Sequence, residues 1–487
     1  MNNWFRKNQY WLSFFPGVAL ALFAGIFNPF SLEPDASKAV AVAALMVTWW
    51  ITEALPIAAV ALIPLFLIPI LNISPFEEVT KAYSNPVIFL FMGGFMIGLA
   101  IQKWNLHKRI ALQIVSVTGS SGDRIILGFI IATGFLSMWL SNTATAMMMF
   151  PIALSIISVI NEHEKPGPGL VNFALVLMLV IAYASNIGGM ATVIGTPPNA
   201  AFVGYIEKKY GYTIQFLDWM MFSLPMVIIL LAAMYFVLTK WLFPNRLANS
   251  NSTNLLMKKE LSELGKISVA EKRVLQVFAV TAFFWITKDL VNGLGFIKLD
   301  DNMIAIMGAL ALFAIPSGNK EGLKIKMLLE WSDTSKMAWG ILLMFGGGIA
   351  LAGALEKVGV MQQIGNWLAG FSQIGGFTLI LMIVIISIFL SELMSNTAQV
   401  IVMAPVLAAL ADALQMDPIL LGLPMAMAAS AASMMPVGTP PNAIVFGSGY
   451  VRFTDMLKAG FVLNIISIIV ITLFSWYFLP LIMGVMK

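Results

Sequence analysis

The chain has no cysteine and few charged residues. Only 11% of its 487 residues are Asp, Glu, Lys or Arg, whereas a soluble globular domain carries about 25%. The absence of cysteine excludes disulfides, thiolate metal sites and cysteine nucleophiles. The two histidines, His107 and His163, both lie in polar connections. The sequence therefore lacks the nucleophile–base pair or the metal ligands that a membrane-embedded hydrolase needs.

Apolar residues dominate what is present, at 59% of the chain with a mean hydropathy of +0.89. Runs of about 20 apolar residues recur along its length, as membrane-spanning helices require. The short polar–apolar alternation of a membrane β-barrel is not seen. The first run is too long for a signal peptide and ends in no small-residue cleavage site, so we expect a retained helix. We expect eleven spans, near 11–30, 38–56, 57–72, 84–101, 170–194, 222–243, 272–290, 302–316, 337–355, 417–436 and 457–484.

Two further apolar stretches, 124–160 and 375–411, are each interrupted near the middle by Ser-Asn-Thr. Polar residues inside a membrane are costly and usually functional. Each stretch is long enough for two short helices, which we interpret as a re-entrant hairpin; the alternative is two ordinary crossings. The motif Gly-Thr-Pro-Pro-Asn-Ala follows each stretch, at 195–200 and 438–443.

The two halves of the chain repeat each other. Ser141 and Ser395 are 254 positions apart, and Trp50-Ile51-Thr52 recurs 235 positions later as Trp285-Ile286-Thr287. If the split stretches are hairpins, each copy has five crossings, and an odd number makes the copies opposite in topology, which is typical of secondary transporters. Basic residues gather in 240–273, which places this segment and the N-terminus in the cytoplasm. The predicted divisions are an N-terminal helix (1–37), a first inverted repeat (38–243, hairpin 124–160), a cytoplasmic linker (244–271) and a second inverted repeat (272–487, hairpin 375–411).

The interruptions have a chemistry of their own. A helix that ends inside the membrane leaves carbonyl and N–H groups unpaired, which is tolerated only in buried protein or against a cavity. Carbonyl and Asn oxygens suit a small cation, whereas N–H groups, Thr hydroxyls and the helix dipole suit an anion. Proline in the second motif prevents a continuous helix. Alone, Ser-Asn-Thr is most often a helix cap and Thr-Pro-Pro a helix start, but two of each in paired order favour a binding site.

Charge is missing where an anion would bind. No Lys or Arg occurs from 125 to 164 or from 397 to 451. Each helix end offers only about half a charge, so a dianion would be poorly compensated. Bound cations would supply the missing charge and couple the two ligands. Glu392, three residues before the second tip, is a candidate for a proton site, for coupling to the cation, or for a structural hydrogen bond.

These paired motifs, together with Gly-Gly-Phe-Met-Ile-Gly-Leu-Ala-Ile-Gln-Lys-Trp-Asn-Leu-His at 93–107, resemble the divalent anion/sodium symporter family. The resemblance is greatest to its bacterial INDY-type di- and tricarboxylate transporters and covers essentially the whole chain. It implies an all-α polytopic homodimer in the lipid of the bacterial inner membrane, with about eleven transmembrane helices and two re-entrant hairpins. It further implies a scaffold domain and an elevator-like transport domain, sodium as coupling ion, and neither an organic cofactor nor a nucleic-acid partner.

The resemblance also implies site residues. For one sodium ion these are Ser137, Ser141, Asn142 and Gly195, and for a second they are Ser391, Met394, Asn396 and Gly438. For the substrate they are Asn142, Thr143, Asn396, Thr397, Thr439 and Pro440, with Thr196 nearby. Ser391 and Gly438 stand where a well-known sodium-coupled pattern has Thr and Ala, so the second site departs from that pattern.

The expected function is sodium-coupled import of C4-dicarboxylates such as succinate, malate or fumarate. The alternatives left open are a sodium-independent dicarboxylate exchanger, citrate or another tricarboxylate as substrate, and a channel.

Overall fold

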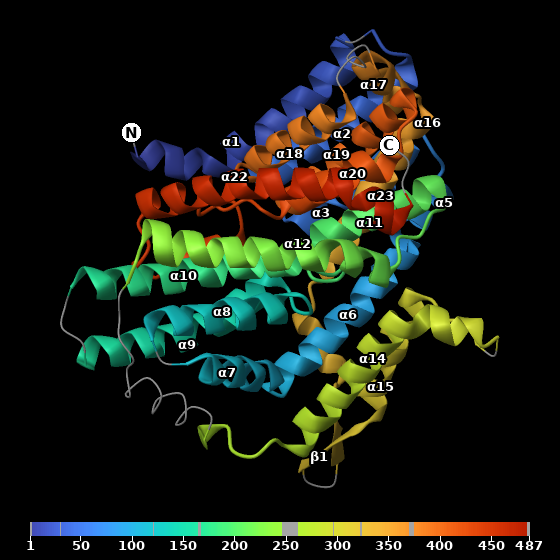
Figure 1. The fold of residues 1–487 in the computed structure, drawn as a ribbon. Helices are drawn as coiled ribbons and strands as arrows, with labels where there is room; N and C mark the ends of the chain where they lie inside the picture. The colour runs from blue at the N-terminus through green and yellow to red at the C-terminus, as the bar shows by residue number, and fades with distance from the viewer. Residues whose placement is uncertain are drawn as a thin grey trace.

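The computed structural model describes residues 2–29, 31–119, 121–163, 167–245, 262–295, 297–321, 324–369 and 375–484. Most of these residues are helical and very few are in strands, which confirms the expected all-α class (Figure 1). The first half contains α1 (Asn2–Leu22, continued by η1, Phe23–Phe27), α2 (Pro34–Thr52), α3 (Ile57–Val60), α4 (Ile63–Ile70), α5 (Phe76–Lys81, continued by η2, Ala82–Ser84), α6 (Pro86–Lys103), α7 (Leu106–Thr118), α8 (Gly122–Ser137), α9 (Asn142–His163), α10 (Pro168–Gly189), α11 (Pro197–Tyr210) and α12 (Phe216–Phe236, continued by η3, Val237–Leu242).

The second half repeats this order with one added hairpin of two strands. It contains α14 (Val269–Gly293), α15 (Asp301–Ala314), β1 (Pro316–Glu321), β2 (Lys324–Met327), η4 (Trp331–Lys336), α16 (Trp339–Lys357), α17 (Val360–Ala369), α18 (Gly376–Ser391), α19 (Asn396–Leu414), α20 (Pro418–Ala429), α21 (Pro440–Phe446), α22 (Phe453–Tyr477) and α23 (Leu479–Met483). Strands β1 and β2 are antiparallel.

Within the described residues, eight helices are long and apolar enough to cross a membrane. Six of these lie on expected spans, and two, α9 and α19, are hairpin arms. Of the other expected spans, 11–30, 57–72, 302–316 and 417–436 lie on shorter apolar helices, and 38–56 lies on the 19-residue α2. The expected span 57–72, for example, is split into α3 and α4, and Pro64 stands in the first turn of α4. A proline is tolerated there because the first helical turn leaves its N–H groups unpaired in any case.

Both Ser-Asn-Thr stretches are broken helices, as the sequence predicts. Helix α8 ends at Ser137 and α9 begins at Asn142. Helix α18 ends at Ser391 and α19 begins at Asn396. The intervening residues form turns, so each tip presents the end of one helix and the start of another.

The two Gly-Thr-Pro-Pro motifs also fall at breaks. Residues 190–196 separate α10 from α11, and 430–439 separate α20 from α21. Each later helix starts at the first proline of its motif, and the Thr before it is extended, with φ of −145° at Thr196 and −144° at Thr439. Proline imposes this geometry because its ring disfavours the helical conformation in the preceding residue.

Ion pairs show that the two hairpins enter from opposite sides. Lys240, at the end of η3, pairs with Asp123 at the start of α8. Lys209, at the far end of α11, pairs at 2.9 Å with Asp412 at the end of α19. Because α12 runs back from the α11 end to the Lys240 end, the α8–α9 hairpin lies on the side of the basic linker and the α18–α19 hairpin on the other. This is the inverted arrangement that the repeat predicts.

The two halves also pack across each other. Helix α21 of the second half contacts α9, and α11 of the first half contacts α19. Each proline-started helix therefore lies against the hairpin of the opposite half. Helix α8 approaches α10 very closely, since a side chain at Gly188 would overlap the backbone of Gly134. Only glycine permits this approach.

Most of the predicted linker, 244–271, lies outside the described residues. Its described end is fixed to α7: Arg109 donates to Glu271 at 2.7 Å and to the carbonyl of Gly265 at 3.0 Å. Ser268 and Glu271 form a capping box at the start of α14. A reciprocal cap of this kind satisfies two backbone donors and fixes where the helix begins.

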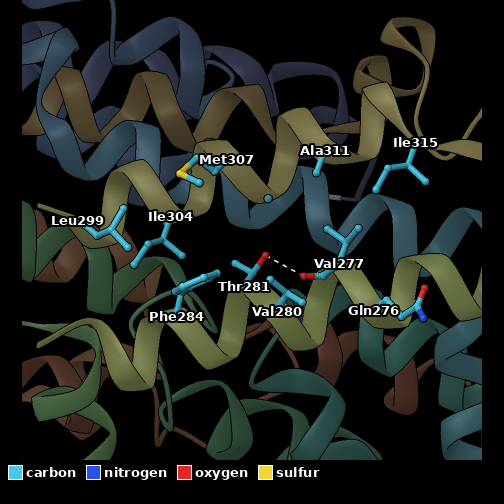
Figure 2. A pocket seen from close by; sticks show the side chains of 11 residues that line it. Gln276, Val277, Val280, Thr281, Phe284, Leu299, Ile304, Met307, Ala311 and Ile315 are labelled. Atoms are coloured by element: carbon cyan, nitrogen blue, oxygen red, sulfur yellow. Dashed lines mark hydrogen bonds between the residues drawn. The ribbon is translucent and has the colours of Figure 1, made fainter. Parts of the chain in front are cut away.

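A groove of about 320 Å³ lies between α14 and α15 (Figure 2). Its lining is almost wholly apolar. The hydroxyl of Thr281 donates within its own helix to the carbonyl of Val277 at 2.9 Å. Gln276 is the one other polar side chain of its lining, so the groove offers a carboxylate little to bind, in contrast to the broken helices.

Candidate functional site

The first tip brings three oxygen atoms together. Ser137 Oγ lies 2.8 Å from Asn142 Oδ1 and 2.7 Å from the carbonyl oxygen of Ser185 on α10. Ser137 is fully buried. One hydroxyl hydrogen is thus shared between two oxygens that can only accept.

The second tip has the same arrangement. Ser391 Oγ lies 2.6 Å from Asn396 Oδ1 and also contacts the carbonyl oxygen of Ala429 on α20. Ser391 is likewise fully buried. The two clusters therefore match in chemistry as well as in position along the repeat. Buried oxygens in excess of hydrogens are the ligands that a hard cation such as sodium prefers.

Glycines allow the backbone to close around the first cluster. A side chain at Gly189 would overlap Asn142 Oδ1, and one at Gly195 would overlap the carbonyl of Gly189. Gly195 is one of the residues predicted for the first sodium ion. It packs against Gly189, which in turn packs against Asn142. In the second half, a Cβ at Gly438 would lie 3.3 Å from Glu392 Oε2.

The Asn of each Gly-Thr-Pro-Pro-Asn motif holds the unwound segment before it. Asn199 Nδ2 donates to the carbonyls of Gly189 (3.2 Å) and Thr192 (2.8 Å). Asn442 Nδ2 donates to the carbonyl of Met435 at 3.0 Å. Neither Asn199 nor Asn442 is among the site residues that the sequence predicts. Their fixed place in the repeated motif was the signal that pointed to a role.

Glu392 anchors the second tip. Its carboxylate accepts the backbone N–H groups of Ser433 (2.8 Å), Met434 (2.8 Å) and Met435 (2.9 Å), and the Nδ2 of Asn464 (2.7 Å). Glu392 is 4% exposed. Four donors thus converge on one buried carboxylate and provide both of its oxygens with hydrogen bonds.

The first tip is anchored differently. At the position equivalent to Glu392 stands Met138, whose carbonyl accepts the hydroxyl of Thr192 at 2.5 Å. Each tip is therefore hydrogen-bonded to the unwound segment beside it. The acceptor is a backbone carbonyl in the first tip and a carboxylate in the second. The two oxygen clusters are alike, whereas their electrostatic surroundings are not.

Asn186 on α10 connects the two halves. Its Nδ2 donates to Thr439 Oγ at 3.0 Å and to Asn442 Oδ1 at 3.3 Å. The residue before it, Ser185, supplies the carbonyl of the first oxygen cluster. Adjacent residues of one helix thus touch the site of each half. Asn186 was not identified from the sequence, because it lies within the expected span 170–194 and belongs to neither repeated motif.

The remaining predicted residues surround these contacts. Ser141 Oγ accepts the N–H of Ala144 at 3.3 Å, and Asn142 Nδ2 lies 3.5 Å from Thr196 Oγ. Thr143 is half-buried beside them. In the second half, Met394 and Thr397 are buried and Asn396 is half-buried, whereas Pro440 is exposed.

An all-helical membrane protein whose inverted halves bring broken helices together defines the class of secondary transporters. Comparison with known proteins agrees. The chain belongs to the family described as the sodium:sulfate symporter transmembrane region, whose model matches residues 7–484. This confirms the resemblance drawn from the paired motifs.

Individual relatives cover nearly the same length. The chain is 42% identical over 465 residues to the sodium-dependent dicarboxylate transporter SdcS of Staphylococcus saprophyticus, covering 94% of this chain and 89% of the relative. It is 38% identical over 464 residues to SdcS of Staphylococcus aureus strain USA300, with the same coverage. The solved structure of the Alcanivorax borkumensis YdaH transporter matches with a TM-score of 0.54 and 12% identity, over 82% of this chain and 87% of that one. At that identity the likeness concerns the fold alone.

Proposed function

We propose that the protein imports C4-dicarboxylates such as succinate, malate or fumarate together with sodium. The observation that carries the proposal is the pair of matching oxygen clusters, Ser137–Asn142–Ser185 and Ser391–Asn396–Ala429. Each suits a small cation, and no Lys or Arg occurs in the tip segments to balance a dianion. Relatives with 38–42% identity are named sodium-dependent dicarboxylate transporters, which supports the same assignment.

The site divides its work between two kinds of atom. Carbonyl and Asn oxygens hold sodium, while the hydroxyls of Thr143, Thr397 and Thr439 and the N-terminal ends of the restarted helices hold the carboxylates. The positive charge of bound sodium offsets the dianion in a site of low dielectric. Each ligand therefore raises the affinity for the other, and this reciprocal coupling is what links their transport.

Uptake of radiolabelled succinate into proteoliposomes tests the assignment. An inward sodium gradient should drive accumulation above equilibrium, and replacing sodium by choline should abolish it. Uptake that requires internal succinate and ignores sodium would replace the symporter by the sodium-independent exchanger. Competition by unlabelled citrate at equal concentration decides whether tricarboxylates are accepted.

The proposal includes an elevator movement of the two hairpins and α10–α12 and α20–α22 against the remaining helices. Its support is a difference between the two tips. Trp139 of the first tip packs edge-on against Phe278 of α14, with 4.8 Å between ring centroids. The equivalent residue of the second tip, Leu393, is 70% exposed. The tip of the first hairpin thus packs on α14, whereas the tip of the second is exposed, although its arm α19 contacts α2, α16 and α17.

The repeat indicates where the second tip would dock. Ala43 on α2 stands 235 positions before Phe278, the offset that relates Trp50 to Trp285. Ala43 lines a cavity of about 190 Å³ between α2 and α19. At the other end of the elevator movement, we expect Leu393 to pack near Ala43 in the way that Trp139 packs on Phe278 in this structure. Because the chain has no cysteine, pairs of cysteines can be introduced to detect this contact without first removing native ones.

Cysteine cross-linking tests the movement. A Trp139→Cys/Phe278→Cys pair should cross-link readily and stop uptake. A Leu393→Cys/Ala43→Cys pair should cross-link during turnover and likewise stop uptake. If the second pair never cross-links in a preparation that transports, the elevator is excluded, and transport without rigid-body movement remains.

The bacterial inner membrane, a cytoplasmic N-terminus and a homodimer also belong to the proposal. The membrane and the homodimer rest on the family resemblance, and the orientation rests on the basic residues gathered in 240–273. A label at Asp35→Cys, in the exposed first turn of α2, should react with an impermeant maleimide from outside intact cells. Native mass spectrometry of the detergent-solubilised protein should give twice the chain mass of 53.1 kDa.

A further inference from the structure

We infer that Asn186 is a positioning residue for substrate binding: it makes the hydroxyl of Thr439 an obligate hydrogen-bond donor to the carboxylate. The inference rests on the proposed function, because it takes Thr439 as a substrate contact. It assigns a role to a residue of the first half in a site formed by the second.

The orientation of the Asn186 amide is fixed by a chain of contacts. Asn442 Nδ2 donates to the carbonyl of Met435 at 3.0 Å, so the other end of that amide, Asn442 Oδ1, is an acceptor. Asn186 must therefore present its NH2 group to Asn442 Oδ1, at 3.3 Å. The second hydrogen of the same NH2 group points to Thr439 Oγ at 3.0 Å. A flipped Asn186 amide would set two carbonyl oxygens against each other.

These contacts occupy the accepting side of Thr439. A hydroxyl has two acceptor lone pairs and one hydrogen. Asn186 Nδ2 fills one lone pair, and the backbone N–H of Asn442 fills the other at 3.4 Å. No acceptor for the Thr439 hydrogen is found among the described residues, and Thr439 is 5% exposed. The hydrogen is left for an anion.

The first half lacks this device. Thr196, the equivalent of Thr439, makes no capping bond in its own helix and meets only Asn142 Nδ2, at 3.5 Å. Ser430 is the counterpart of Asn186 in the second half. It follows Ala429, whose carbonyl is equivalent to that of Ser185. Its buried hydroxyl has no partner among the described residues. The two halves therefore contribute unequally, with the stronger donor at Thr439.

Leaving Asn186 Oδ1 without a partner is costly, and that cost points to a function. This oxygen is buried and has no partner in the described part of the chain, and the residue is 1% exposed. A buried, unpaired polar atom opposes folding, so a site that needed only shape would be better served by an apolar residue. The amide is retained where its two hydrogens are needed.

The test is a double-mutant cycle on succinate uptake at saturating sodium. Asn186→Leu removes the donor with similar volume, and Asn186→Ser reproduces the residue of the other half. Both should raise the succinate KM about tenfold, as expected for weakening a hydrogen bond to a charged group. Thr439→Val should do the same. The matched control, Ser430→Ala, removes a hydroxyl that has no partner and should leave KM unchanged.

Non-additivity is the readout that a merely structural role would not produce. In the Thr439→Val background, either Asn186 substitution should change KM by less than about twofold, because the donor that it orients is already gone. In the Thr439→Ser background, which keeps the hydroxyl, the tenfold effect should persist. Additive effects, or a wild-type KM in both folded Asn186 variants, would overturn the inference. Absence of sodium-driven succinate uptake in the wild-type protein would instead refute the proposed function.

Discussion

Replacing Glu392 by Gln should weaken sodium binding more than it weakens substrate binding. The substitution removes one negative charge with almost no change in volume. Glu392 Oε2 lies 3.3 Å from the position of a Cβ on Gly438, a residue proposed to bind the second sodium ion. The carboxylate of Glu392 therefore lies close to the proposed position of that ion, although Glu392 is not one of its proposed ligands.

The magnitude follows from this separation. If the ion lies about 6 Å from the carboxylate, on the far side of Gly438, the two unit charges interact by about 3 kcal/mol at an effective dielectric of about 20. Partial screening and rearrangement of the four donors reduce this, so the loss should be about 1.4–2.7 kcal/mol, or about tenfold to hundredfold in sodium affinity. The first site has Met138 in place of this carboxylate and should be unaffected.

Sodium titration of succinate uptake, and of the thermal unfolding temperature in detergent, measures the effect. Asp35→Asn is the matched control, because it also removes one negative charge but from an exposed pair with Lys38. The half-saturating sodium concentration should rise at least tenfold in Glu392→Gln and stay constant in the control. A folded Glu392→Gln protein with the wild-type sodium dependence would refute the electrostatic role and leave the carboxylate a structural clamp.

Further substitutions probe other parts of the structure. Gly189→Ala should abolish sodium-driven uptake, because its methyl group would overlap Asn142 Oδ1, whereas Gly293→Ala, which has open space around it, should retain uptake; both are read by the same flux assay. Thr143→Val and Thr397→Val should each raise the succinate KM with an unchanged unfolding temperature, and an unaltered KM in both would remove these hydroxyls from the site. Arg109→Ala should destabilise the protein by about 3 kcal/mol by leaving the buried Glu271 unpaired, while Lys38→Ala, from an exposed pair, should cost less than about 1 kcal/mol; calorimetry that gave equal losses would contradict this.

Much of the architecture could be predicted from residue types whose backbone preferences are strong. Pro197 and Pro440 fix helix starts, and Ser141 and Ser395 interrupt apolar runs that leave little doubt about a membrane. The breaks at these positions follow from local chemistry. The opposite entry of the hairpins follows from counting crossings in each repeat.

Contacts between the halves could not be predicted in the same way. Asn186 lies in an apolar span, and nothing nearby in the sequence indicates that it faces Thr439, which is 253 residues away. The clamp on Glu392 likewise depends on the unwound segment at 433–435, which a pattern of apolar residues does not reveal. Such contacts arise from how the two repeats pack together.

The central claim is that the paired breaks form one site in which sodium and a dicarboxylate bind together. Calorimetric titration of succinate into the purified protein, with and without sodium, tests it directly when the Asn142→Ala and Asn396→Ala variants are measured in parallel. The account predicts binding only with sodium in the wild-type protein, and loss of that sodium dependence in each variant. Equal succinate affinity with and without sodium in the wild-type protein would contradict it.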